Sequence, residues 1–353
     1  MAYTTIKKPS DYFNTKLYSG DGNTTQAITG VGFQPDFTWL KNRSDGGAWH
    51  RLSDGVRGVT KILYSNSTNA ESTTDANGYI ASFDSDGLTV NLGSSGTGTG
   101  TNSSGDNFVT WNWLADNTTA SNTDGDITST VSANTTSGFS IVTYTGNGTS
   151  GTQVGHGLGS TPAVVLVKSR SIGQGWVMYH KNLTSPSYFL GLNYTDAETN
   201  QSNVFSGNAP TSSTFYIGAG GYGANNSGET YIAYCFAEKQ GFSKFGSYTG
   251  NGSTDGTFIY TGFKPAFVIG KRTNATEDWY LFDGTRDDTN PCNKLLYPGQ
   301  SNAEYTLADR MDFLSNGFKQ YNADLKFNGS GDTYIYMAFA EEPLVGDNPA
   351  TAR

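Results

Sequence analysis

The sequence is poor in cysteine, histidine and charge. Of its 353 residues, 2 are Cys, 3 are His and 15% are charged. Two distant cysteines, Cys235 and Cys292, exclude a disulfide framework and a thiolate metal cluster. No run approaches the ~18 apolar residues of a membrane-spanning helix, and the first residues lack the apolar segment of a signal peptide. We therefore expect no membrane partner.

The few charges are scattered and mostly negative. The formal net charge is -9, and Lys and Arg occur singly or in pairs. Because binding to the phosphates of DNA or RNA requires clustered cations, no nucleic-acid partner is expected.

Glycine and aromatic residues are abundant instead. The chain has 45 Gly, 21 Tyr, 20 Phe and 6 Trp. Short segments rich in β-branched and aromatic residues, separated by Gly, Asn, Asp and Ser, predict β-structure throughout. Type I′ hairpin turns are predicted at Asp21-Gly22 and Asn147-Gly148. The best short helical candidate is Tyr305–Leu314.

One block of sequence recurs three times along the chain. Its markers are a proline, an apolar strand ending in Lys, a following Trp and a closing apolar strand that ends in an acid. The three sets are Pro35, Lys41, Trp49 and Asp116; Pro162, Lys168, Trp176 and Glu238; Pro265, Lys271, Trp279 and Glu341. Units of about 100 residues with this pattern are typical of β-sandwiches and jelly rolls, so we expect three tandem repeats.

The composition also predicts where the repeats begin and end. The stretch 118–137 is almost entirely Asn, Thr, Ser, Asp, Gly and Ala, which is typical of a linker. The expected segments are an N-terminal arm (1–16), repeat 1 (17–117), the linker (118–137), repeat 2 (138–240), repeat 3 (241–344) and a polar tail (345–353).

The recurring residues are expected to serve the fold. Alternation places Trp176 with Met178, and Trp279 with Leu281, so this Trp position is predicted to face the core in every repeat. The recurring Lys/Arg pairs are predicted to contact the closing acids Asp116, Glu238 and Glu341. Specificity is expected where the copies differ, in the loops 66–77, 195–213 and 287–303. The predicted ligand-contacting residues, on the opposite strand face or in loops, are Tyr179, His180, Tyr280, Tyr222 and Tyr305.

No motif indicates catalysis. Two matches to G-x-G-x-x-G, at 146–151 and 218–223, lack the following helix that dinucleotide binding needs. The glutamates are sparse and form no closely spaced run of the kind a retaining glycosidase places on one strand face, although pairs that converge in space stay open. We expect no enzyme, no cofactor and no metal. An irregular Ca²⁺ loop at 84–87 or 124–126 stays open beside the simpler reading as turns.

Three segments resemble virion structural and tail-fibre-like proteins of marine tailed bacteriophages, and the likeness extends over essentially the whole chain. They are residues 2–15, 34–44 and 338–353. The resemblance implies a location in the virion after assembly in the host cytoplasm, and a concanavalin-like lectin fold. The resemblance names no ligand. The leading hypothesis is a tail fibre or spike that contacts host-surface polysaccharide, docked to other virion proteins through the N-terminal arm, with a trimer as the favoured homo-oligomer. A capsid- or tail-decorating protein and a polysaccharide depolymerase are the alternatives.

Overall fold

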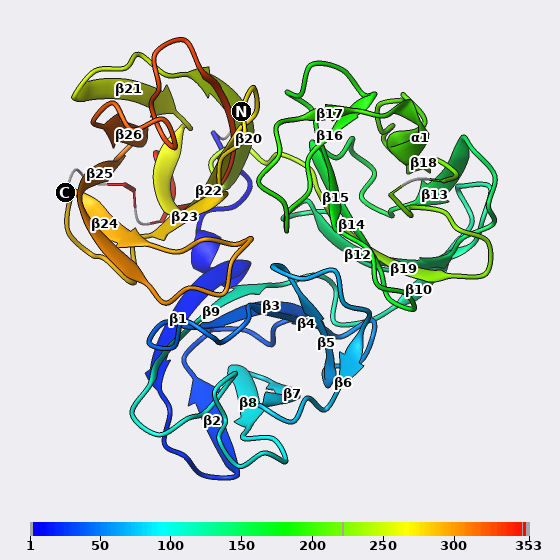
Figure 1. Ribbon diagram of the computed structural model, residues 1–353, viewed down its shortest axis with the longest axis horizontal. Coiled ribbons are helices and arrows are strands. Elements are labelled where there is room, and N and C mark those ends of the chain that lie inside the picture. The colour runs from blue at the N-terminus through cyan, green and yellow to red at the C-terminus, as the bar shows by residue number, and fades with distance from the viewer. Residues whose placement is uncertain (1–2, 221, 348, 351–353) are drawn as a thin grey trace.

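The computed structural model describes residues 3–220, 222–347 and 349–350. The chain is all-β, as predicted, and its strands form antiparallel sheets. Within the described part, the helical elements are two single turns, η1 (Pro9–Asp11) and α1 (Ser202–Phe205), and neither is long enough to cross a membrane. The sheets form three lobes around a common centre (Figure 1). We call them lobe 1 (β1–β9), lobe 2 (β10–β19) and lobe 3 (β20–β27).

The strands are short and follow one another with brief connections. Lobe 1 contains β1 (Phe13–Ser19), β2 (Thr25–Thr29), β3 (Phe37–Asn42), β4 (Arg51–Asp54), β5 (Lys61–Tyr64), β6 (Ser72–Thr73), β7 (Tyr79–Asp84), β8 (Gly87–Asn91) and β9 (Asn107–Trp113). Lobe 2 contains β10 (Ala120–Asn122), β11 (Ser129–Asn134), β12 (Phe139–Thr145), β13 (Thr152–Gly155), β14 (Val164–Ser169), β15 (Val177–His180), β16 (Tyr188–Phe189), β17 (Thr199–Asn200), β18 (Thr214–Ile217) and β19 (Thr230–Phe236). Lobe 3 contains β20 (Ser243–Thr249), β21 (Asp255–Tyr260), β22 (Phe263–Arg272), β23 (Tyr280–Asp283), β24 (Cys292–Leu295), β25 (Tyr305–Leu314), β26 (Gly317–Tyr321) and β27 (Thr333–Pro343).

Each lobe has an inner sheet with the same strand order. The order is β1-β9-β3-β4 in lobe 1, β12-β19-β14-β15 in lobe 2 and β20-β27-β22-β23 in lobe 3. An outer sheet also belongs to each lobe: β2-β8-β7, β13-β18 and β21-β26-β25-β24. One face of each inner sheet packs on the apolar core within its own lobe, and the other face packs on the apolar core between the lobes. Strands β3 and β14 are therefore buried at every position, unlike strands with one face in water.

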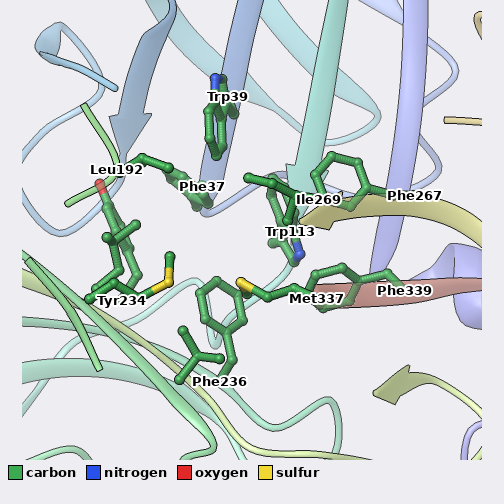
Figure 2. A pocket seen from close by; sticks show the side chains of 13 residues that line it. Phe37, Trp39, Trp113, Leu192, Tyr234, Phe236, Phe267, Ile269, Met337 and Phe339 are labelled. Atoms are coloured by element: carbon green, nitrogen blue, oxygen red, sulfur yellow. The ribbon is translucent and has the colours of Figure 1, made fainter. Parts of the chain in front are cut away.

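The largest apolar core lies where the three inner sheets meet. It takes Trp111 and Trp113 from lobe 1, Phe236 from lobe 2, and Phe267 and Phe339 from lobe 3. Figure 2 shows the side chains of Trp113, Phe236, Phe267 and Phe339 converging, with others, on a cavity of about 30 Å³, which is large enough for a water molecule. The cavity is a packing gap at the centre, and we assign it no ligand.

The predicted linker at 118–137 is wrong. Its residues form β10 and β11, which extend the inner sheet of lobe 2 by pairing with β12. Ser129 and Ser132 are buried there, and the Ser129 hydroxyl donates to the Gly155 carbonyl at 2.8 Å. Backbone pairing orders this polar stretch, which the composition alone does not reveal.

The predicted N-terminal arm is not separate from the β-structure. Strand β1 begins at Phe13, inside the range 1–16, and η1 precedes it. The residues before η1 lie on lobe 3: the Tyr3 hydroxyl donates to the Gly262 carbonyl at 2.6 Å, and Ile6 is buried in the central core. The expectation of a separate arm is therefore wrong for the described residues, whereas docking of this segment to other virion proteins stays a prediction. Residues 1–2, and 348 and 351–353 of the predicted tail, lie outside them.

Two local predictions are also wrong. The expected helix is strand β25, which pairs with β24 and β26. The dipeptide Asp21-Gly22 does not close a hairpin, because β1 pairs with β9 whereas β2 pairs with β8 in the outer sheet. At both predicted turns only the glycine has a positive φ, 73° at Gly22 and 74° at Gly148, and a type I′ turn needs two such residues.

The recurring lysines are buried between lobes and do not contact the closing acids. The ammonium group of Lys41 donates to the Ser301 carbonyl at 3.0 Å, that of Lys168 to Thr68 at 3.2 Å, and that of Lys271 to Thr195 at 3.0 Å. Each acceptor belongs to another lobe. The acids have other partners instead, such as Lys181 for Glu238, Lys264 for Glu341 and Thr118 for Asp116. The predicted pairing is wrong because the lysine side chains point into the interfaces between lobes and bond to carbonyl groups there.

Burial lowers the pKa of Lys41 to about 7 and that of Lys168 and Lys271 to about 8. Between these values and about 10.4, the unfolded chain binds more protons than the folded one. The free energy of unfolding is therefore expected to rise with pH from about 7 to about 9, by up to about 1.4 kcal/mol per pH unit for each proton of difference. Urea titrations at several pH values measure this slope. Lys41→Met is expected to lower this slope, because Lys168 and Lys271 still contribute, and the exposed Lys8→Met is expected to leave it unchanged. A flat wild-type profile would contradict the prediction.

Candidate functional site

The side chain of Trp49 differs from the other tryptophans in its exposure. It is 37% exposed, whereas the other five tryptophans of the chain are 5% exposed or less. The pairing registers explain the difference. Leu40 pairs with Arg51, Val167 with Val177 and Gly270 with Tyr280, so the residue before each following strand is His50, Trp176 or Trp279. Trp49 is thus one residue away from the buried position, and its predicted place in the core is wrong.

Trp49 forms one wall of a pocket of about 270 Å³ at the edge of lobe 1. The indole packs edge-to-face on the Tyr64 ring, with ring centroids 5.1 Å apart. The remaining walls come from the ends of β4 to β6 and from the loops around them: Gly47, Ala48, Arg51, Asn69, Ala70, Ser72, Asp75, Asn77 and Thr99. The pocket therefore combines an exposed aromatic surface with several hydrogen-bonding groups.

A connected set of polar groups forms the floor of this pocket. The Arg51 guanidinium lies 5.7 Å from the centre of the Tyr64 ring and donates to Asp75 Oδ1 at 3.2 Å. The Tyr64 hydroxyl donates to Asp75 Oδ2 at 2.6 Å, and the Asn77 backbone N–H donates to Oδ1 at 2.8 Å. Gly100 lies against this guanidinium, since a Cβ there would be 1.9 Å from Arg51 Cζ. The floor is rigid and its two charges neutralise each other.

These contacts determine the protonation of the floor. Burial raises the pKa of Tyr64 to about 12, and the hydrogen bond to Asp75 adds to the effect. Burial also acts to raise the pKa of Asp75, but the hydrogen bonds from Tyr64 and Asn77 and the charge of Arg51 outweigh it and lower this pKa. Asp75 is thus ionised and Tyr64 protonated at neutral pH.

The corresponding places in lobes 2 and 3 are filled. Gly175 occupies the position of Trp49 in lobe 2, and Tyr194 lies against it: a Cβ at Gly175 would be 2.5 Å from the Tyr194 oxygen. In lobe 3 the position is Asp278, which accepts a hydrogen bond from Gln300 and lies 3.9 Å from the Lys326 ammonium. The aromatic pocket therefore belongs to lobe 1, in a region where the copies differ.

The pocket lining has several hydrogen-bonding groups but a single carboxylate. Glycosidases use two carboxyl groups across the scissile bond, and Asp75 is the one carboxylate among the lining residues. No group of three His, Cys, Asp or Glu side chains suited to a metal occurs among the described residues. The Asp-rich segments considered for Ca²⁺ act in turns: Asp86 accepts from the N–H groups of Gly30 and Gly32, and Asp126 from that of Gln153.

The predicted ligand-contacting residues are not brought together. Tyr179, His180 and Tyr280 are buried, because the inner sheets are covered on both faces, so their prediction as contacts is wrong. Tyr222 is half-buried and packs on Phe189, with ring centroids 4.8 Å apart. Tyr305 is exposed and packs on Tyr297, and it is not among the residues that line the Trp49 pocket.

The sequence contains a pattern that gives the correct alignment of the first copy with the third. Asp54-Gly55-Val56-Arg57 and Asp283-Gly284-Thr285-Arg286 follow β4 and β23 with the same spacing. Aligning on this D-G-x-R pattern places His50, not Trp49, opposite Trp279. The loop 66–77, in which specificity was expected, supplies five of the lining residues: Asn69, Ala70, Ser72, Asp75 and Asn77.

Comparison with known proteins gives a family without a known function. No curated protein matches the chain. Residues 8–343 match a family described as a domain of unknown function, DUF7483, and this match covers all three lobes. The chain therefore belongs to the DUF7483 family.

Proposed function

We propose that this chain is a non-catalytic structural protein of a phage virion that binds a neutral sugar of the host surface in the Trp49 pocket. The observation that carries the proposal is the exposed indole of Trp49 beside a fixed polar floor. Aromatic faces stack on the apolar faces of sugar rings, and an exposed Trp is a favoured anchor in binding sites. The paired charges of Arg51 and Asp75 favour an uncharged ligand.

The lobes themselves support the finer description of the fold. We propose that they are three copies of one jelly-roll or concanavalin-like sandwich, on the basis of their common inner-sheet order and recurring buried lysines. Location in the virion, as a tail fibre or spike, rests on the resemblance of the segments 2–15, 34–44 and 338–353. Assembly into a trimer is part of the same proposal.

Sugar binding is measured by tryptophan fluorescence. Because Trp49 is by far the most exposed of the 6 tryptophans, its emission is expected to change in a saturable way with one member of a panel of glucose, galactose, mannose and N-acetylglucosamine. Trp49→Ala is expected to weaken binding, followed by calorimetry, by about tenfold or more, which corresponds to about 1.4 kcal/mol.

The matched control is Tyr260→Ala, because Tyr260 is 58% exposed and lies on β21 of lobe 3. This variant is expected to bind the same sugar as tightly as the wild type. Equal affinity in Trp49→Ala would sink the assignment of the pocket. Release of new reducing ends from host polysaccharide would contradict the non-catalytic part of the proposal.

A further inference from the structure

The three interfaces between lobes place a glutamate at the same position. Glu71 of lobe 1 donates its backbone N–H to the Arg170 carbonyl of lobe 2 at 2.8 Å. The same bond joins Glu304 of lobe 3 to Arg43 of lobe 1 at 2.9 Å, and Glu198 of lobe 2 to Thr273 of lobe 3 at 2.8 Å. Each acceptor residue comes two positions after a buried lysine. The glutamates are therefore equivalent, and their surroundings can be compared directly.

At two of the interfaces the glutamate lies between two arginines. The Glu71 carboxylate accepts from Arg57 at 3.1 Å and from Arg170 at 2.8 Å. Glu304 accepts from Arg286 at 2.9 Å and from Arg43 at 2.7 Å. The arginine of the neighbouring lobe binds with two nitrogens in both cases, through Nε and Nη2. Two-pronged contacts of this kind are a strong form of carboxylate recognition.

The third interface keeps the glutamate and loses both arginines. Leu183 occupies the position of Arg57 and Arg286, and Thr273 occupies that of Arg43 and Arg170. The Glu198 carboxylate accepts from the Thr184 backbone N–H at 2.9 Å and from the Thr184 hydroxyl. Among the residues that the structure describes, no cationic nitrogen lies within 4.0 Å of it.

Open space lies beside Glu198 and Thr273. A cavity of about 270 Å³ lies between lobes 2 and 3, lined by Glu198, Thr184, Thr273, Thr333 and neighbouring residues. Thr273 and Thr333 bond to each other through their hydroxyls at 2.7 Å, along the wall that an arginine at position 273 would cover. The cavity thus presents a carboxylate that lacks a cationic partner among the described residues, where the equivalent interfaces hold a guanidinium.

We propose that this cavity binds a guanidinium group, the arginine side chain of a partner polypeptide, with Glu198 as its carboxylate acceptor. The planar guanidinium fits the two-pronged geometry that Glu71 and Glu304 show, whereas an ammonium group does not reproduce it. The site lies in another part of the molecule from the Trp49 pocket and does not depend on sugar binding, so either assignment can fail alone.

The probe is N-acetyl-L-arginine methylamide, titrated into the full chain and followed by NMR. Saturable binding of this probe is expected. The neutral citrulline analogue has nearly the same shape but lacks the charge, so its affinity is expected to be lower by about tenfold or more. Glu198→Gln is expected to cause a similar loss. Glu229→Gln, which changes a carboxylate bonded to Ser171 elsewhere in lobe 2, is expected to bind like the wild type.

Thr273→Arg supplies a guanidinium from within the chain. It is expected to abolish binding of the probe and to raise the melting temperature. The proposal is overturned if the arginine probe shows no saturable binding, if the citrulline analogue binds equally well, or if Glu198→Gln binds like the wild type. Should Thr273→Arg fail to fold, the comparison of Glu198→Gln with Glu229→Gln still decides.

Discussion

Replacing Phe339 with alanine is expected to lower the free energy of unfolding by about 3–5 kcal/mol, because a large buried ring is lost and its neighbours cannot fill the space. Phe339 lies in the core shared by all three lobes. Its ring contacts six other aromatic rings, which come from every lobe: Phe13, Trp113, Phe236, Phe242, Phe245 and Phe267. A cavity here weakens the packing of each lobe on the other two.

Denaturant titration followed by circular dichroism measures the loss. Phe258→Ala is the matched control, since Phe258 lies on β21 of the same lobe and is 44% exposed. The control is expected to change stability by less than about 1 kcal/mol. A loss of similar size in both variants would contradict the large contribution expected of Phe339 in the central core.

Arg57→Leu is expected to lower the free energy of unfolding by about 3–5 kcal/mol, because it leaves a buried carboxylate without its cation. The side chains of Arg57 and Asp54 are both fully buried, and Arg57 Nε lies 2.5 Å from Asp54 Oδ2. The same carboxylate oxygen accepts from the Tyr234 hydroxyl of lobe 2 at 2.7 Å. The loss therefore affects both the turn after β4 and the contact between lobes 1 and 2.

Lobe 2 suggests a second substitution that should compensate for the loss of Arg57. It has His180 and Leu183 at the positions of Asp54 and Arg57, and burial lowers the pKa of His180 to about 4, so this position carries no charge at neutral pH. Adding Asp54→His to Arg57→Leu is expected to restore part of the lost stability, because no unpaired charge stays buried. For comparison, Lys8→Leu breaks the exposed pair with Asp11 and is expected to cost about 0–1 kcal/mol. If Arg57→Leu cost no more than Lys8→Leu, the buried pair would have no structural role.

The features that could be predicted from the sequence are those with a local cause. The β-branched and aromatic segments predict all-β structure, and alternation along β15 and β23 predicts that Trp176 and Trp279 are buried. The misplacement of Trp49 comes from a one-residue error in aligning the copies, which moves a side chain to the other face of a strand.

The features that could not be predicted depend on distant parts of the chain. Tyr179 and Tyr280 read as outward-facing residues of half-buried strands, but a second sheet of the same lobe covers that face. The polar segments of β10 and β11 have little hydrophobic pattern. They form strands because β11 pairs with β12, which follows them in the chain. The lack of a cation beside Glu198 follows from arginines that are absent at two separate positions, 183 and 273, and neither residue stands out on its own.

Because a single chain supplies all three lobes, each contact between them can change without the other two. In a ring of three identical subunits, a substitution appears at every interface at once, so exchanging a stabilising arginine for a binding site would weaken the whole ring. In the part of the chain that the structure describes, two interfaces have a buried arginine beside their glutamate, and the third has a leucine at that position. Because the lobes differ, each chain has one Trp49 pocket and one Glu198 cavity. Binding through several copies of the same site, with the gain in affinity this gives, therefore requires several chains held side by side.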